Sequence, residues 1–198
     1  MISDDIKLRN KLARIRKQHS EVIDIILFGS AVRGKERPND VDVLVLFEDK
    51  IDKEVEYMIR KELEKSSKGI AIISKTKRTL VEDSFDARES IFCEGKSLLD
   101  RRNLAADYGF TSFGMFKYDF RRWDKLMKTK FYYALNGRSS KKGVADALNC
   151  IKLSDSLILA PLEHIEEFRE FLESWKLPYL YTPALIPKRM ARKQILER

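Results

Sequence analysis

Histidine and cysteine are scarce in this chain of 198 residues. The two histidines and two cysteines, His19, His164, Cys93 and Cys150, lie far apart and lack the spacing of a zinc site or a disulfide framework. We expect the two thiols to be reduced and buried among their apolar neighbours. The composition therefore argues against a structural zinc site and against a mechanism centred on histidine.

Long apolar runs are also absent from the sequence. None approaches the roughly 20 residues that a helix needs to cross a bilayer. The first residues, MISDDIKLRNKLARIRKQ, are highly charged and do not resemble a secretory signal. We therefore expect a soluble, cytoplasmic protein with no membrane partner, and the sequence leaves its oligomeric state open.

Positive charge is concentrated in the second half of the chain, which has a formal net charge of +8 overall. Residues 1–100 carry 20 basic and 20 acidic side chains, whereas residues 101–198 carry 19 basic and 11 acidic ones. An excess confined to one half predicts an anionic partner for that half. The alternative is a basic surface that serves only solubility.

The first 95 residues show alternating helical and strand patterns. Ser3, followed by two aspartates, resembles the N-cap of a helix that ends near Gln18. Apolar and β-branched runs predict strands at 22–28, 41–47 and 69–74, the first two buried on both faces. Helical spacing of apolar residues predicts helices over about 51–63 and 77–94. This order predicts an α/β (α+β) core built on a small mixed sheet.

Composition places a domain boundary near residue 100, between a first domain of residues 1–100 and a basic α+β domain of residues 101–198. In the second domain, apolar side chains at helical spacing predict a buried stripe made of Phe120, Trp123, Met127, Phe131 and Ala134. Another face of the same predicted helix carries Arg121, Lys125, Lys128 and Tyr132. A strand at 158–160, a helix at 161–175 and a strand at 179–186 are also expected.

Two carboxylates, Asp40 and Asp42, begin the apolar run VLVLF. Because side chains alternate along a strand, both should point to the same side. Two anions about 5 Å apart repel by on the order of 3 kcal/mol at an effective dielectric near 20. Water, a proton, a cationic side chain or a divalent cation can offset this repulsion, and a divalent cation takes carboxylate oxygens as hard ligands.

The preceding strand ends in a Gly-Ser pair, which favours the divalent cation. Gly29 lets backbone N–H groups approach a phosphate, the Ser30 hydroxyl can donate to it, and a helix beginning there would add its positive end. Arg33 and Lys35 in the same loop can neutralise phosphate charge. A phosphate-holding turn beside an acid pair is what nucleotidyl transfer requires. The alternative is a hairpin-like loop whose acids merely face solvent.

The segments FGS at 28–30 and DVDV at 40–43, nine residues apart, resemble the signature of the DNA polymerase beta-like nucleotidyltransferase superfamily, and especially its minimal nucleotidyltransferase branch. The resemblance covers roughly residues 20 to 95. It implies that Gly29 and Ser30 hold the triphosphate of an NTP, most simply ATP. It also implies that Asp40 and Asp42 are catalytic ligands of Mg²⁺ or Mn²⁺. Members of the superfamily modify nucleic acids, small molecules or partner proteins.

This sequence departs from the superfamily's pattern at the third carboxylate, which active members usually carry on the next core strand. The predicted strand GIAIIS contains no acid, and the nearest ones are Glu64, Glu82, Asp83 and Asp86. We hypothesise that Asp83 or Asp86 substitutes for it. An enzyme that works with two acids, and a protein that binds nucleotide without catalysis, stay open as alternatives.

The basic half suits a phosphodiester backbone, because Lys and Arg gain from released counterions and need no particular base. The expected nucleic-acid-binding residues are Arg121, Lys125, Lys128, Arg138, Lys141 and Lys142. RNA is favoured over duplex DNA because no helix-turn-helix, zinc finger or basic zipper pattern is present. We therefore expect a metal-dependent nucleotidyltransferase acting on RNA. The alternatives are an inactive nucleotide- or RNA-binding protein and an enzyme that adenylylates a protein or a small molecule.

Overall fold

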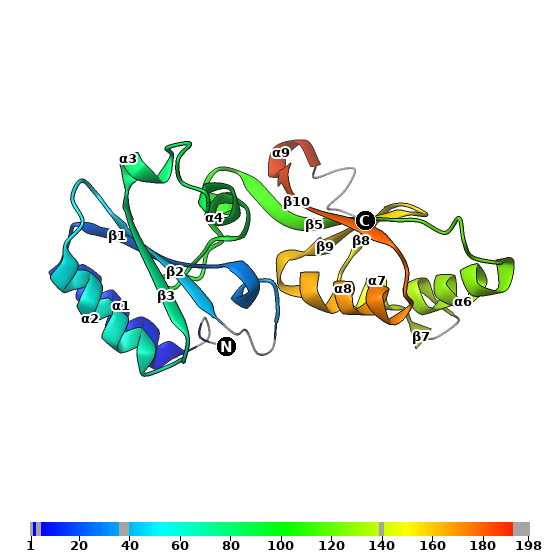
Figure 1. The fold of residues 1–198 in the computed structure, drawn as a ribbon, viewed down its shortest axis with the longest axis horizontal. Helices are drawn as coiled ribbons and strands as arrows, with labels where there is room; N and C mark the ends of the chain where they lie inside the picture. Colours follow the sequence, from blue (N-terminus) through cyan, green and yellow to red (C-terminus); the bar gives the residue numbers. More distant parts are fainter. Residues whose placement is uncertain (1, 3–4, 36–39, 139–140, 192–198) are drawn as a thin grey trace. The chain divides into compact units, whose positions relative to one another are not determined.

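The computed structural model describes residues 2, 5–35, 40–138 and 141–191 of the chain. These residues form two compact units, Met1–Tyr108 and Gly109–Arg198. Each unit has its own four-stranded sheet (Figure 1), and each is described by itself.

The sheet of the first unit is mixed. Its strand order is β3 (Ile70–Thr76), β2 (Val41–Phe47), β1 (Val22–Phe28) and β4 (Lys96–Ser97). Strands β2 and β3 are parallel, whereas β1 runs antiparallel to both β2 and β4. The α/β class and the mixed sheet predicted from the sequence are confirmed. Nearly every residue of β1 and β2 is buried, because helices cover both faces.

Helices α1 (Ile6–Gln18) and α2 (Lys53–Glu64) pack against each other, and Figure 1 shows them side by side along the sheet. The carboxylate of Asp5 caps α1 by accepting a hydrogen bond from the Leu8 N–H at 3.0 Å. The predicted cap at Ser3 lies outside the described residues. Asp52 caps α2 in the same way, so that both helices begin at an aspartate.

A separate apolar cluster forms where α4 (Arg88–Glu94) packs on the sheet. It joins Ile91 of α4 to Ile26 of β1 and to Leu44 and Leu46 of β2. Because side chains alternate along a strand, Asp42 lies on the same face of β2 as Leu44 and Leu46. The acid at the start of β2 is therefore on the α4 side of the sheet.

The single helix predicted over residues 77–94 is wrong. The structure has a short helix α3 (Lys77–Leu80), a loop, and then α4. The loop exists because Phe85 inserts into the same apolar cluster, where its side chain is 7% exposed. The Arg88 guanidinium donates to the Val81 carbonyl and pairs with Asp83, so the loop satisfies its polar groups without helical hydrogen bonds.

Asp24 of β1 is a carboxylate whose burial should affect stability. It accepts hydrogen bonds from the Ser97 hydroxyl and the Ile25 N–H, both at 2.7 Å. Burial nevertheless raises the pKa of Asp24. The folded protein thus holds this proton more tightly than the unfolded chain, and Asp24 lowers stability as the pH rises from about 4 through its raised pKa.

We expect Asp24→Asn to raise the melting temperature by a few degrees near neutral pH and to change it little at about pH 4. The amide removes the charge and keeps the oxygen that accepts both hydrogen bonds. Asp100 is the control: burial opposes its ionisation, but hydrogen bonds from the side chain and backbone of Arg102 hold its pKa low. Asp100→Asn should therefore destabilise the protein near neutral pH, and thermal unfolding of both variants across this range would test the pair.

The second unit is built on an antiparallel sheet in the order β10, β5, β9, β8. These strands are β5 (Phe110–Tyr118), β8 (Ile151–Ser154), β9 (Leu157–Pro161) and β10 (Tyr179–Pro187). The longer helices are α6 (Lys125–Asn136) and α8 (Ile165–Ser174). Short elements complete the chain: α5 (Leu104–Asp107), which belongs to the first unit, β6 (Gly137–Arg138), β7 (Lys141–Lys142), α7 (Val144–Ala147), η3 (Leu162–His164) and α9 (Lys188–Ala191).

The apolar stripe predicted on one helix is partly wrong. Helix α6 begins only at Lys125, because Asp124 caps it by accepting from the Met127 N–H at 2.7 Å. Phe120 and Trp123 lie before the helix, yet their rings still pack on Phe131, at centroid distances of 5.4 and 5.6 Å. Phe131 is buried as predicted, whereas Met127 is exposed.

The two thiols, Cys93 and Cys150, are free and partly buried. Burial raises the pKa of Cys150 to about 12, so it is an unreactive thiol at neutral pH. Among the helices in the described part of the chain, none is both long and apolar enough to cross a membrane.

Candidate functional site

The two carboxylates lie at the start of β2. Asp40 immediately precedes the strand and is exposed, and Asp42, its second residue, is half-buried opposite Phe28 of β1. Burial raises the pKa of Asp42, and the nearby charge of Asp40 raises it further, while Arg33 acts in the opposite direction. The Asp40 carboxylate is therefore close enough to disfavour the ionisation of Asp42.

A tight turn brings the end of β1 against Asp42. Gly29 has a φ of +75°, and a Cβ placed on it would lie 2.7 Å from Asp42 Oδ2. Only glycine leaves room for the carboxylate here, and the positive φ independently favours glycine. The turn continues as η2 (Gly29–Ala31), a 3₁₀ turn of three residues. The longer helix whose positive end we expected at this point is not formed.

Arg33 contacts Glu94, an acid that nothing in the sequence indicates as part of the site. Its Nη1 atom donates to both carboxylate oxygens of Glu94, at 3.1 and 2.9 Å. The Glu94 side chain is only 6% exposed and lies at the end of α4, 61 positions further along the chain. Arg33 therefore ties the turn to α4. The guanidinium that we expected to neutralise triphosphate charge is thus also part of a structural ion pair. Lys35 is exposed and carries no such partner among the described contacts.

The strand beside Asp42 carries no acid. In the parallel register Asp42 lies opposite Ala71, which is exposed, and the next residue of β3 on that face, Ile73, packs into the apolar cluster. Within the described part of the chain, no three His, Cys, Asp or Glu side chains gather as a metal site. Among the described residues, the third carboxylate that the sequence lacks on this strand is not supplied from elsewhere in the fold either.

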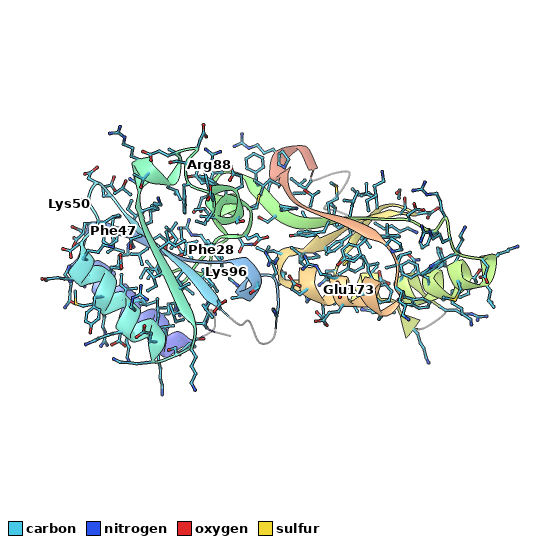
Figure 2. The ribbon with its side chains drawn as sticks, viewed as in Figure 1. Phe28, Phe47, Lys50, Arg88, Lys96 and Glu173 are labelled. Carbon is cyan, nitrogen blue, oxygen red and sulfur yellow. The ribbon has the colours of Figure 1, made fainter. Side chains whose placement is uncertain are left out.

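The hypothesis that Asp83 or Asp86 supplies the third carboxylate is wrong. Both follow β3, which ends at Thr76 opposite Phe47. Phe28 and Phe47, labelled in Figure 2, mark opposite ends of the β1–β2 ladder, and Asp42 lies at the Phe28 end. Five residues of strand, roughly 16 Å, separate Asp42 from the end that leads to these acids.

The acid pair fits a divalent cation. Asp40 and Asp42 offer hard oxygen ligands at the start of a strand, where burial and the Asp40 charge raise the pKa of Asp42. Mg²⁺ characteristically binds through one or two carboxylates together with substrate phosphates and water. Two carboxylates beside a glycine turn are therefore a sufficient protein contribution when the substrate phosphates supply the other ligands.

The basic residues of the second unit fall into two groups. Lys125 and Lys128 are exposed on α6, and Arg121 precedes the helix and pairs with Asp119. Arg138, Lys141 and Lys142 are exposed on the β6–β7 hairpin that follows α6. The predicted basic face is therefore interrupted at its start, because Arg121 is not part of the helix.

Residues 10–103 match the family model described as polymerase beta, nucleotidyltransferase. The first unit is a polymerase beta-type nucleotidyltransferase domain. The match includes the Gly-Ser turn and both aspartates, and nucleotidyl transfer is the general chemistry of this family. The resemblance drawn from residues 28–30 and 40–43 is confirmed.

Solved structures of toxin–antitoxin proteins are similar to the nucleotidyltransferase domain over 46% of this chain. A toxin–antitoxin complex with AMP-PNP shares 22% identity, with a TM-score of 0.34 and 71% of that chain covered. A mutant MntA–HpeT pair shares 20% (TM-score 0.34, 70% covered). A tri-AMPylated Shewanella oneidensis HEPN toxin with an MNT antitoxin shares 21% (TM-score 0.30, 69% covered). No curated protein matches the chain.

These scores are too low to carry information about this protein's substrate. The role of the nucleotidyltransferase domain is therefore argued from its own residues and from the family match.

The ion pair between Arg33 and Glu94 gives a test of how the turn is held in the nucleotidyltransferase domain. We expect Glu94→Gln to destabilise the protein by about 2 kcal/mol, because it removes a buried charge that pairs with a partly buried guanidinium. Chemical denaturation would measure the loss. Glu89→Gln on the same helix removes an exposed pair with Arg88 and is the matched control. Equal stability of the two variants would show that the buried pair does not hold the turn.

Proposed function

We propose that the protein is a metal-dependent nucleotidyltransferase that moves a nucleoside monophosphate from an NTP, with ATP the expected donor, to an RNA acceptor. The observation that carries this proposal is Asp42 packed against the Gly29 turn, with the Asp40 charge close to it, within a polymerase beta-type domain. In the reaction, an acceptor hydroxyl oxygen bonds to the α-phosphorus, and the bond to the leaving pyrophosphate breaks.

Each residue of the site has a role in this reaction. Asp40 and Asp42 would hold Mg²⁺ or Mn²⁺. The bound cation would supply charge stabilisation at the attacking oxygen and at the leaving pyrophosphate. The turn at Gly29 offers backbone N–H groups and the Ser30 hydroxyl to the triphosphate, and Lys35 adds an exposed positive charge. Arg33, held by Glu94, keeps the turn against the acid pair.

RNA as the acceptor is supported by the charge of the second unit. Its exposed cations lie on α6 and on the hairpin after it, and such cations attract a phosphodiester backbone through counterion release. An acceptor that is a protein or a small molecule would leave this charge without a function. ATP is the donor to test first, and the other three triphosphates belong in the same experiment.

The experiment is an incubation of the purified protein with each α-labelled nucleoside triphosphate, Mg²⁺ or Mn²⁺, and either total cellular RNA or a protein extract. The Asp40→Ala/Asp42→Ala variant is the control. Label in RNA that depends on both aspartates supports the proposal. Aspartate-dependent label in protein or in a small molecule would replace RNA as the acceptor while leaving the reaction class intact.

A second candidate function is favoured by one observation, the alanine at position 71. A domain that lacks the third carboxylate could bind nucleotide and RNA without transferring a nucleotide. Ala71→Asp distinguishes the two functions, because it places a carboxylate beside Asp42 at an exposed position of β3. We expect the variant to raise the transfer rate of a two-acid enzyme by up to about 100-fold, the low end of what an acid–base group contributes.

If neither the natural protein nor the Ala71→Asp variant transfers nucleotide, while both bind it, the binding function holds. The matched control for Ala71→Asp is Ala71→Asn, which adds the same volume without a charge.

A further inference from the structure

Two neighbouring tyrosines are exposed on α6 of the second unit. Tyr132 is 52% exposed and Tyr133 42% exposed. Each ring has a cation on it: Lys152 Nζ lies 5.2 Å from the Tyr132 ring centroid, and Arg138 Cζ lies 5.0 Å from that of Tyr133. Half-exposed aromatic rings beside cations are the elements with which proteins bind unpaired bases and their phosphates.

Lys152 links Tyr132 to the lining of a pocket of about 720 Å³. Lys128, one helical turn before Tyr132, lines it, and so does Asp155, which pairs with Lys152 at 2.9 Å. Lys152 thus contacts both the Tyr132 ring and an acid of the pocket wall. The Tyr132 ring and the pocket lining therefore meet at Lys152 and Asp155 within the second unit.

The pocket combines flat apolar walls with positive charge. Phe120, Tyr179 and Leu180 contribute aromatic and aliphatic surface, and Leu180 is left 72% exposed. Lys128, together with Lys117 and Arg121, places cations in the lining. A nucleotide has this pairing of a flat base with an anionic phosphate, and the volume is within the range of ligand pockets in proteins.

A buried hydroxyl in the pocket lining has no hydrogen-bond partner. Tyr118 is 2% exposed, and its hydroxyl finds no partner among the described residues. A buried polar atom without a partner costs stability, and it calls for an explanation such as a missing water, ion or ligand. The edge of a base carries donors and acceptors, and one of them could form the hydrogen bond that this hydroxyl lacks.

We propose that this surface binds single-stranded RNA, with bases stacked on Tyr132 and Tyr133 and one unpaired nucleotide seated in the pocket beside Tyr118. The inference rests on the proposed function for the choice of RNA and adds the class of RNA. Bases within a duplex are already stacked and paired, so they can neither cover an exposed ring nor enter a pocket. The backbone lies along Lys128 and the cations of the β6–β7 hairpin.

Fluorescence anisotropy tests the proposal without turnover. The Asp40→Ala/Asp42→Ala protein is titrated with a labelled single-stranded RNA of about 12 nucleotides and with the same strand in a duplex, at equal salt. We expect the single strand to bind at least about tenfold more tightly, in line with the contribution of one stacked base. Equal affinity for the two RNAs would overturn the inference.

Variants locate the contacts. We expect Tyr132→Ala to weaken single-strand binding about tenfold and to leave duplex binding unchanged, whereas Tyr132→Phe keeps the ring and the affinity. Tyr118→Phe should weaken single-strand binding while raising the melting temperature, because it removes the unpartnered hydroxyl. If Tyr132→Ala binds as the parent does, the stacking surface is wrong. If Tyr118→Phe binds as the parent does, the seated nucleotide is wrong.

Failure of this inference and failure of the proposed function are distinguishable. Transfer to RNA without preference for single strands would overturn only the inference. Single-strand binding without transfer in the natural protein would overturn only the proposed reaction. Binding to neither RNA would overturn both the inference and RNA as the acceptor.

Discussion

Replacing Asp40 and Asp42 together by alanine is expected to lower the rate of nucleotidyl transfer by on the order of 1,000-fold or more. The structure places Asp42 against the Gly29 turn with the Asp40 charge close to it, and the described part of β3 offers no third acid to retain the cation. Transfer of label from the preferred α-labelled triphosphate, under single-turnover conditions, measures the loss.

The protein chain offers a matched control for this double substitution. Glu48→Ala/Asp49→Ala removes two exposed carboxylates that directly follow β2 at its opposite end. It changes the charge by the same amount, and we expect it to leave the transfer rate within about twofold. A double variant at Asp40 and Asp42 that keeps the natural rate would refute the assignment of the site.

The stability of the same variant supplies an independent readout. Because partial burial and Asp40 both raise the pKa of Asp42, its ionised form disfavours the folded state at neutral pH. The variant should therefore melt no lower than the natural protein in the absence of metal. Mg²⁺ with ATP should raise the melting temperature of the natural protein and leave that of the variant unchanged. A lower melting temperature without metal would point to a structural role for the pair.

Reversing the charge of Arg121, Lys125 and Lys128 to glutamate is expected to weaken RNA binding at least 100-fold at low salt. Each residue is exposed on or just before α6. The logarithm of affinity should fall steeply with the logarithm of salt concentration in the natural protein. If all three cations contact phosphates, the slope should become shallower by about 2 in the variant, since each contact with a single strand contributes about 0.7.

The control for the charge reversal lies in the first unit. Lys53 and Lys61 are cations of α2 and Lys65 directly follows it, and converting the three to glutamate changes the net charge by the same amount. We expect this variant to lose much less affinity than the α6 variant. Equal losses would mean that RNA binding depends on net charge alone. Binding that is insensitive to salt would mean that the basic surface serves only solubility.

Local signals in the sequence were sufficient for the two central strands of the first unit. The β-branched runs at 22–28 and 41–47 became β1 and β2, since no helix-favouring pattern competes with them. The prediction of one helix over 77–94 was wrong because helical spacing in Lys77–Glu94 says nothing of where Phe85 is buried. In the second unit, the strand at 110–118 was missed because its aromatic residues continue into a segment with helical spacing.

The residues of the site also divide into those that could be assigned from the sequence and those that could not. Asp42 and Gly29 could be assigned from sequence because the chemistry of each is local: one lies at the start of a strand, and the other ends the strand before it. Glu94 could not be found, because its pairing with Arg33 spans 61 positions and follows from the packing of α4 on the sheet. The rejection of Asp83 and Asp86 likewise needed the direction of β3.

The sequence by itself determined the nucleotidyltransferase class of the first unit, the acid pair, the absence of an acid on β3, and the basic character of the second unit. These properties reside in residue type and short-range spacing, which folding does not alter. Only the tertiary structure decided that Arg33 is held by Glu94, that Ala71 is the residue beside Asp42, and that Lys152 links Tyr132 to the lining of a pocket. Such contacts join segments far apart in the chain, and strand register and side-chain packing set them.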